Sequence, residues 1–306
     1  GALVTAFSWR AIFYLAVPLG AITFAVSCAK LRGEWAEAKG EPFDWQGSLV
    51  YAAAILLLIS GASNLDKGPW AWLLALCGTG GLILFLVLEA RTEYPVLNVT
   101  LLRSNRVFAF SNLAAMLNYA ATFGVTFFLS LYLQYVKGLN PREAGTILII
   151  QPIVQAAFSP LCGRLADRFS AASVATLGMT LCAAGLGMAA SITADTSIPL
   201  IMTMLATLGL GFALFSSPNI SVIMGSVPPR YLGVASGLNS TMRTLGMMAS
   251  MTIITIIFSI FMAGHAVTPE TQPQFLTSMH TALLTFSALC VVGIFFSIAR
   301  IQRQPQ

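Results

Sequence analysis

Long apolar runs follow one another through almost the whole of this 306-residue sequence. About 20 mostly apolar residues in a helix are enough to cross the hydrocarbon core of a membrane. Because backbone amides in lipid are satisfied only within a helix or a closed barrel, and the alternating segments of a barrel are missing here, these runs predict an all-α polytopic membrane protein. The nine predicted spans are 11–30, 46–65, 69–90, 107–135, 143–161, 171–192, 198–224, 232–263 and 275–299.

The composition excludes several classes of protein. Only 9% of the residues are charged and 57% are hydrophobic, whereas a soluble domain carries about a quarter of its residues as charged side chains. A soluble enzyme, a disordered chain and a nucleic-acid-binding protein are therefore excluded. No metal or cofactor site is predicted, and the cysteines are interpreted as small buried hydrophobic residues: Cys28, Cys77, Cys162, Cys182 and Cys290.

The basic residues predict an orientation in the membrane. If the segment before the first span lies outside, eleven of the 16 Lys and Arg residues fall in cytoplasmic segments, as the positive-inside rule requires. The C-terminus is then cytoplasmic. The predicted cytoplasmic set is Lys30, Arg32, Lys39, Arg91, Arg103, Arg106, Arg164, Arg168, Arg230, Arg300 and Arg303; the outside set is Arg10, Lys67, Lys137 and Arg142, and Arg243 falls within a span.

Several segments resemble the major facilitator superfamily, and within it the fourteen-helix drug:proton antiporters of the EmrB/QacA type. The stretch FSWRAIFYLAVPLG at 7–20 matches a signature that opens the sixth helix of that branch, although Ala16 stands where the family usually has Asn. Further matches are FDWQG at 43–47, the segments 89–97 and 130–145, and the long stretch 214–246. Together they extend over essentially the whole chain.

The resemblance implies helices six to fourteen of a fourteen-helix plan, truncated at the N-terminus. Residues 1–30 would end an N-terminal bundle, 31–106 would hold a linker and two inserted helices, and 107–306 would form a complete six-helix C-terminal bundle of two inverted repeats. The implied partners are the lipid bilayer, a small-molecule substrate and the missing N-terminal bundle. The implied location is a prokaryotic inner membrane.

The function implied by the resemblance is transport by alternating access, with proton-coupled efflux of amphipathic or drug-like solutes. Two alternatives remain: a facilitator or metabolite exporter that protons do not drive, and a truncated fragment that does not transport. An enzyme is not predicted, because the sequence has no HExxH motif and no pair of aspartates within the spans. No Asp or Glu lies near the centre of a span, so a coupling carboxylate is expected outside these 306 residues.

Polar side chains within three spans are candidates for a substrate pathway. At 100° per residue, Asn112, Tyr119, Thr122, Thr126 and Ser130 fall within an arc of about 80°. Such a stripe would be costly against lipid and should face protein or water; hydrogen bonding between helices is the alternative role. The predicted pathway residues are Asn112, Tyr119, Thr122, Thr126, Gln151, Gln155, Phe212, Phe215, Ser216 and Asn219.

The segment GRLADRF at 163–169 resembles a cytoplasmic loop motif of the superfamily. It predicts a cytoplasmic gate formed by Gly163, Asp167, Arg168 and Arg243. A plain solvated loop, and an Arg243 that reaches the lipid headgroups, are the alternatives. A small-residue pattern at Gly233 and Gly237 predicts close helix packing.

Overall fold

The computed structural model describes residues 10–30, 44–62, 64, 68–92, 95, 97, 99–262, 265, 267–268 and 270–301. Several predicted features lie outside these ranges. They are Trp9, the linker residues 31–43, the ends of the predicted spans at 65 and 263, and the basic residues Arg32, Lys39, Lys67 and Arg303. The described elements are α2 (Arg10–Lys30), α3 (Trp45–Ala62), α4 (Pro69–Glu89), α5 (Val99–Ser104), α6 (Arg106–Leu131), the π-helical turn η2 (Tyr132–Val136), α7 (Pro141–Leu148), α8 (Ile150–Arg168), α9 (Ala171–Ala190), α10 (Ile198–Gly225), the 3-10 turn η3 (Pro229–Tyr231), α11 (Leu232–Met262) and α12 (Gln272–Ala299).

The described part of the chain is helical, as the apolar runs predict. Seven of its helical segments are long and apolar enough to cross a membrane, from Pro69–Glu89 to Gln272–Ala299. Shorter apolar helices, Ala16–Lys30 and Trp45–Gly61, lie where the first two spans are predicted. The prediction of an all-α polytopic membrane protein is therefore confirmed.

The fifth predicted span is not one continuous helix. It begins with α7, where the Asn140 side chain accepts hydrogen bonds from the Arg142 and Glu143 amides and the Glu143 carboxylate accepts one from the Asn140 amide. The helix then breaks at Ile149, and α8 begins. Pro152 lies in the first turn of α8 and has no amide hydrogen to donate to the carbonyl four residues earlier, which accounts for the break.

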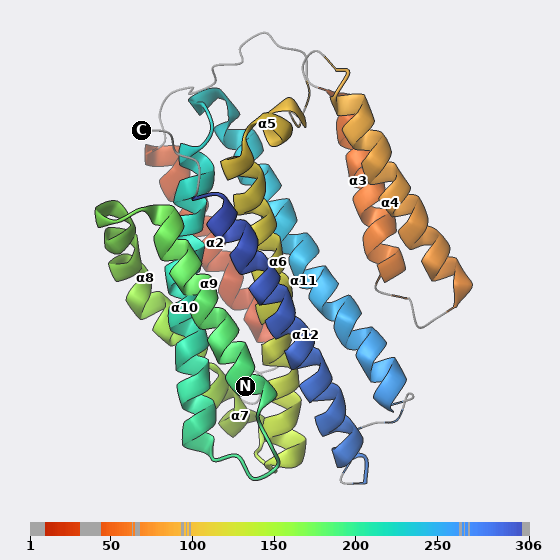
Figure 1. The fold of residues 1–306 in the computed structure, drawn as a ribbon, viewed down its shortest axis with the longest axis vertical. Helices are drawn as coiled ribbons and strands as arrows, with labels where there is room; N and C mark the ends of the chain where they lie inside the picture. The colour runs from red at the N-terminus through yellow and green to blue at the C-terminus, as the bar shows by residue number, and fades with distance from the viewer. Residues whose placement is uncertain are drawn as a thin grey trace.

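Six membrane segments form one bundle: α6, α7 with α8, α9, α10, α11 and α12 (Figure 1). Their packing has an internal symmetry. The contact between α6 and α11 corresponds to the contact between α10 and α8. The contact between α12 and α6 corresponds to the contact between α9 and α10, and α9 and α12 pack on each other. Each of the first three helices thus has a counterpart among the last three.

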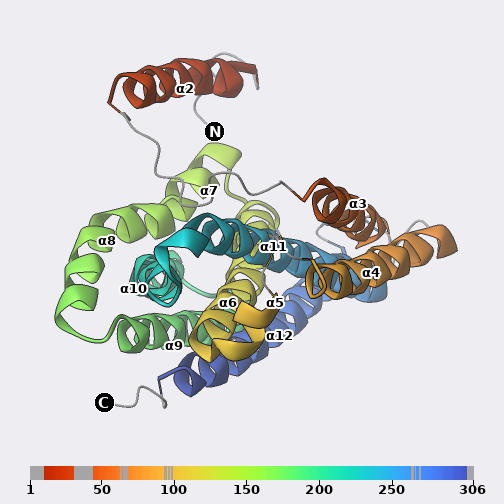
Figure 2. The same ribbon diagram turned by 90° about the horizontal axis from the view of Figure 1, so that it is seen from above.

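The other apolar helices, α2, α3 and α4, lie beside this bundle. α3 and α4 pack closely on each other as a hairpin, and α3 contacts α11. Figure 2 shows this hairpin next to α11 and α2 on a separate side. A hydrogen bond of 2.5 Å joins the Tyr51 hydroxyl of α3 to the Thr241 hydroxyl of α11.

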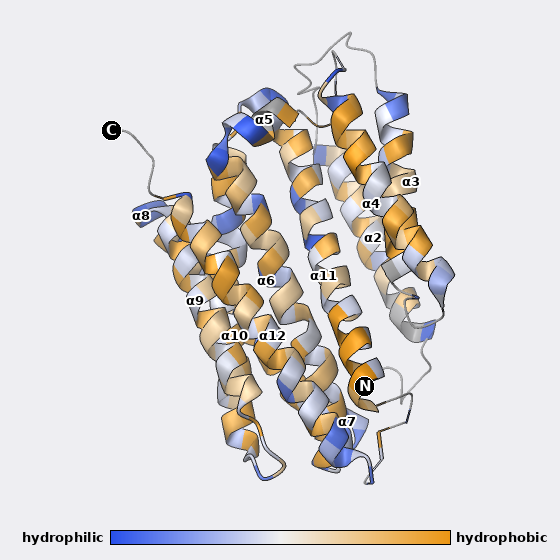
Figure 3. Ribbon diagram, turned by 45° about the vertical axis from the view of Figure 1, so that its right-hand side comes forward, coloured by the Kyte–Doolittle hydropathy of each residue, from blue (hydrophilic) through white to orange (hydrophobic). Residues whose placement is uncertain are grey.

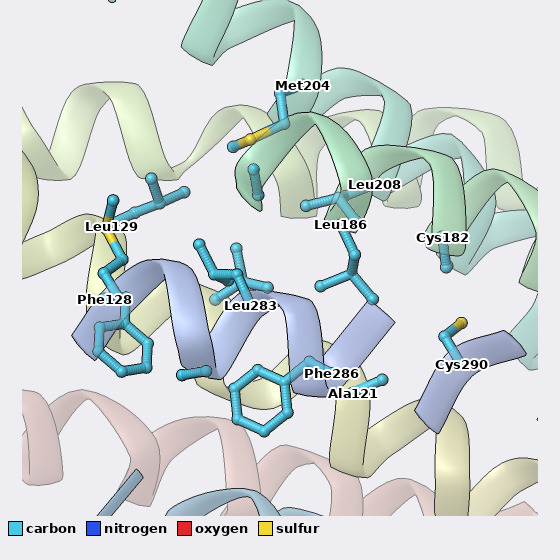
Figure 4. Close-up of a cluster of buried hydrophobic side chains, with 14 of the residues drawn as sticks. Ala121, Phe128, Leu129, Cys182, Leu186, Met204, Leu208, Leu283, Phe286 and Cys290 are labelled. Carbon is cyan, nitrogen blue, oxygen red and sulfur yellow. The ribbon is translucent and has the colours of Figure 1, made fainter. Parts of the chain in front are cut away.

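Apolar side chains fill the centre of the bundle. Phe128 and Leu129 of α6, Leu186 of α9 and Phe286 of α12 are fully buried together (Figure 4). Figure 4 also shows Cys182 and Cys290 in this core, without a disulfide. The interpretation of all five cysteines as buried is wrong for Cys28 and Cys77, which are exposed; α2 and α4 direct apolar surface outward, and a thiol is tolerated there.

The outer faces of the helices are apolar as well. Large hydrophobic side chains such as Phe24, Leu76 and Ile260 are more than half exposed, and hydrophilic residues gather at helix ends (Figure 3). A soluble protein rarely exposes so much contiguous apolar area. This surface is the one expected of a bundle whose solvent is lipid.

Candidate functional site

A cavity of about 440 Å³ lies among four helices of the bundle. Side chains of α6, α8, α10 and α11 line it, and α9 and α12 contribute none. The lining residues are Tyr119, Thr122, Phe123, Thr126, Phe127, Gln151, Phe212, Met247 and Met251.

Five predicted pathway residues meet in this cavity: Tyr119, Thr122, Thr126, Gln151 and Phe212. The Tyr119 and Phe212 rings pack edge to face, with 5.3 Å between their centroids. Aromatic and methionine side chains offer an adaptable apolar wall, and the hydroxyl and amide groups provide a few polar contacts. Such a lining suits an amphipathic or aromatic molecule.

The other predicted pathway residues lie elsewhere. Asn112 is buried, and its amide donates to the carbonyl of Phe108 within the same helix at 2.9 Å. Phe215 belongs to the hydrophobic core. Gln155 and Ser216 are half-buried outside the set of residues that line the cavity. Asn219 is buried in a polar network near the end of α12.

The predicted gate residues are also distributed differently. Gly163, Asp167 and Arg168 lie in the last part of α8, where both charged side chains are exposed. Arg243 instead lies over Tyr119, with its guanidinium carbon 5.7 Å from the ring centroid. It is eleven residues into α11, or about 16 Å from the start of that helix. Met247 and Met251 follow at intervals of four, so Arg243 shares the face of α11 that lines the cavity.

Arg300, at the end of α12, is the centre of the polar network that contains Asn219. Its Nη1 donates to the Ser111 hydroxyl at 2.9 Å and to the Asn219 side-chain oxygen, and its Nη2 donates to the Ala172 carbonyl at 3.3 Å. The Asn219 amide donates to the Ser111 carbonyl at 3.2 Å. Four helices, α6, α9, α10 and α12, are thereby joined around one guanidinium.

The charge on Arg300 persists despite its burial. Only 3% of the residue is exposed, and burial lowers the pKa of Arg300 to about 10. This value is still far above neutral pH. The sequence predicted Arg300 only as a cytoplasmic charge and Asn219 only as a pathway residue. The signal that could have joined them is that an Asn within an apolar span requires a polar partner on another helix.

Asn118 is a second buried polar residue that the sequence analysis did not select. It is fully buried in α6, and neither its side-chain oxygen nor its nitrogen has a hydrogen-bond partner among the described residues. Its backbone carbonyl accepts from the Thr122 hydroxyl at 2.7 Å.

The described residues contain no group of three or more His, Cys, Asp or Glu side chains that could hold a metal ion.

The model of the Major Facilitator Superfamily matches this chain over residues 1–251 and again over residues 110–304. The chain belongs to this superfamily.

Curated relatives are bacterial transport and resistance proteins. The chain is 29% identical to the riboflavin transporter RibZ of Clostridioides difficile, over 86% of this chain and 56% of that protein. It is 29% identical to the multidrug resistance protein Stp of Mycobacterium tuberculosis, and 27% identical to the tetracenomycin C resistance and export protein of Streptomyces glaucescens, in both cases over 80% of this chain and 46% of the relative. The chain thus spans about half the length of these relatives. They are not enzymes.

Solved structures of other transporters share the fold. A bacterial homologue of the human lysosomal transporter Spinster, in an inward-facing conformation, superimposes with a TM-score of 0.53 at 14% identity, over 82% of this chain and 68% of that one. The nucleoside transporter NupG superimposes with a TM-score of 0.52 at 15% identity, over 83% of this chain and 66% of that one.

Proposed function

We propose that this chain forms the C-terminal part of a transporter that moves amphipathic solutes across a bacterial inner membrane by alternating access. The cavity among α6, α8, α10 and α11 carries the proposal. It is lined by Tyr119, Gln151 and Phe212 from three different helices, and Phe212 also packs against the hydrophobic core. Alternating access requires such a site between two bundles.

The proposed plan is helices six to fourteen of fourteen. The symmetric packing of α6 to α12 supports a complete C-terminal bundle from 107 onward, and the position of the α3–α4 hairpin outside this bundle supports an inserted pair within 31–106. In this plan α2 ends an N-terminal bundle, which is the partner that closes the other side of the cavity.

The proposed substrates are planar aromatic or amphipathic molecules, exported with a proton gradient as the driving force. The names of the relatives fit this class, since one is a riboflavin transporter and two are resistance proteins. Arg243 beside Tyr119 adds a positive charge at one edge of the cavity. We propose Arg243 as the gate residue nearest the substrate, and Gly163, Asp167 and Arg168 as the part of the gate at the end of α8.

Filling the cavity tests the proposal. Thr126→Trp in the full-length protein should lower the rate of dye efflux from cells at least tenfold, because an indole in place of the hydroxyl occupies the space of the substrate. Thr180→Trp is the matched control: Thr180 is exposed on α9 and does not line the cavity. Equal efflux by both variants would contradict a substrate site in this cavity.

A transporter that protons do not drive is the second candidate. One observation favours it: no acidic side chain is among the described residues that line the cavity. An uncoupler distinguishes the two. Proton-driven efflux of the dye should stop when the uncoupler collapses the gradient, whereas a facilitator should continue to equilibrate the dye at an unchanged rate.

A further inference from the structure

Two cavities meet around Arg300, at the end of the bundle where α12 ends and α6 and α9 begin. One has a volume of about 470 Å³ and the other about 390 Å³. Asn105, Val107 and Arg300 line both, Ser170, Ala171 and Ala172 line the first, and Arg106 lines the second. We call this region the Arg300 cleft.

The cleft contains a positive charge that the described part of the chain does not neutralise. The hydrogen-bond partners of Arg300 are a hydroxyl, an amide oxygen and a carbonyl, all of them neutral. Its Nε has no partner among the described residues. None of the described residues that line the two cavities is acidic. Burial of a guanidinium without an anion is unfavourable, because the charge loses its water and gains no opposite charge.

Two helix N-termini add to this charge. Ser170 is the N-cap of α9, a helix of 20 residues, and its side chain makes no capping hydrogen bond. Asn105 is the N-cap of α6, a helix of 26 residues; its side chain accepts from the Phe108 amide, and Arg106 follows it at the edge of the cleft. The first amides of a helix carry a partial positive charge and are suited to bind a phosphate.

We propose that the Arg300 cleft binds a phosphate group. Two sources offer this chemistry: the headgroup of an anionic phospholipid at the membrane surface, and a free phosphate-bearing solute. The phosphate would supply the anion that Arg300 lacks and the acceptor that the first turn of α9 lacks. The site is separate from the cavity of Tyr119 and Phe212, and it does not depend on what the protein transports.

Thermal unfolding of the full-length protein in a neutral detergent tests the site, with inorganic phosphate as the titrant at constant ionic strength. The wild type should show a saturable rise in Tm. Arg300→Gln should weaken the apparent affinity at least tenfold. Ser170→Asp should do the same while the fold is kept, because Asp is a good N-cap and places a carboxylate in the cleft. Arg142→Gln is the control: it removes the same charge from an exposed position on α7.

Vesicles distinguish the two sources. The same variants are incubated with vesicles of phosphatidylglycerol or of phosphatidylcholine, and their binding is compared. Selective binding of phosphatidylglycerol that Arg300→Gln and Ser170→Asp lose identifies a lipid headgroup, whereas stabilisation by inorganic phosphate without this selectivity identifies a solute site. The proposal is overturned if the wild type responds to neither probe, or if both cleft variants respond as Arg142→Gln does.

Discussion

Asn219 shows how one polar residue in an apolar helix constrains its neighbours. It accepts from Arg300 and donates to the Ser111 carbonyl, so that α10 is joined to α12 and α6 at the same point. Its exposed fraction is 1%. Because these side chains are buried, the network is expected to contribute more to stability than an exposed hydrogen bond does.

We expect Asn219→Ala to lower the stability of the protein by about 2 to 3 kcal/mol, because a buried guanidinium loses an acceptor. Asn219→Asp keeps the acceptor for Arg300 and adds a negative charge, but it loses the amide that donates to the Ser111 carbonyl, so its Tm should fall less than that of Asn219→Ala. Thermal unfolding in detergent measures both. Ser221→Ala is the control, since the Ser221 hydroxyl is exposed and bonds only to its own helix. A Tm of Asn219→Ala equal to that of Ser221→Ala would refute this role for Asn219.

Periodicity predicted some of these residues and not others. Three residues of the predicted stripe on α6, Tyr119, Thr122 and Thr126, share a cavity. Periodicity gives the angle of a side chain around its own helix but not the helix it meets. Asn112 lies on the same predicted stripe and is buried at a helix contact, and the partners of Arg300 lie 81 to 189 residues away.

At the scale of helices, glycines decide how closely α6 and α11 approach. A Cβ at Gly246 would overlap the Met116 carbonyl oxygen and lie 3.1 Å from the Tyr119 Cβ. Gly233 and Gly237, whose spacing predicts close packing, have nothing within 4 Å of such a Cβ among the described residues, and they line an apolar crevice next to Tyr51 and Phe85. The packing contact lies at Gly246, outside the predicted pattern.

Two alanine substitutions on α11 test this difference. Gly246→Ala should destabilise the protein by about 1 to 3 kcal/mol, since α6 and α11 must separate to admit a methyl group. Gly237→Ala adds the same methyl group in open space and should leave the Tm unchanged or slightly higher, because alanine favours a helix. Thermal unfolding measures both variants. A larger fall in Tm for Gly237→Ala than for Gly246→Ala would show that the α6–α11 contact is misplaced.

At the scale of the whole molecule, the charges at the helix ends predict one orientation in the membrane. α7, with Arg142, lies at the opposite end of the bundle from the last turn of α8, with Arg168 (Figure 1). The positive-inside rule assigns the end with Arg168, Arg230 and Arg300 to the cytoplasm.

Single cysteines measure this orientation in intact cells, in a background without the native cysteines. A membrane-impermeant maleimide should label Arg142→Cys directly, and Arg168→Cys only after the cells are permeabilised. Both side chains are exposed, so access differs only by the side of the membrane. Labelling of Arg168→Cys alone in intact cells would reverse the orientation.

The positions of the long apolar helices were predictable because apolar length determines where membrane helices form. The details that hydropathy missed have local causes: the break at Ile149 comes from a proline, and the π-helical turn at Tyr132–Val136 is a change of hydrogen-bond register within an apolar run. Hydropathy did not predict which helices contact one another, because an apolar face packs against lipid and against protein equally well.

The α3–α4 hairpin packs tightly on itself and joins the bundle chiefly at α11. Both of its ends lie on the same side of the molecule, where α5 also lies (Figure 1). A unit of this kind enters the membrane as a pair and leaves the direction of every later helix unchanged. The six-helix bundle that follows therefore has the same orientation with the hairpin as it would have without it.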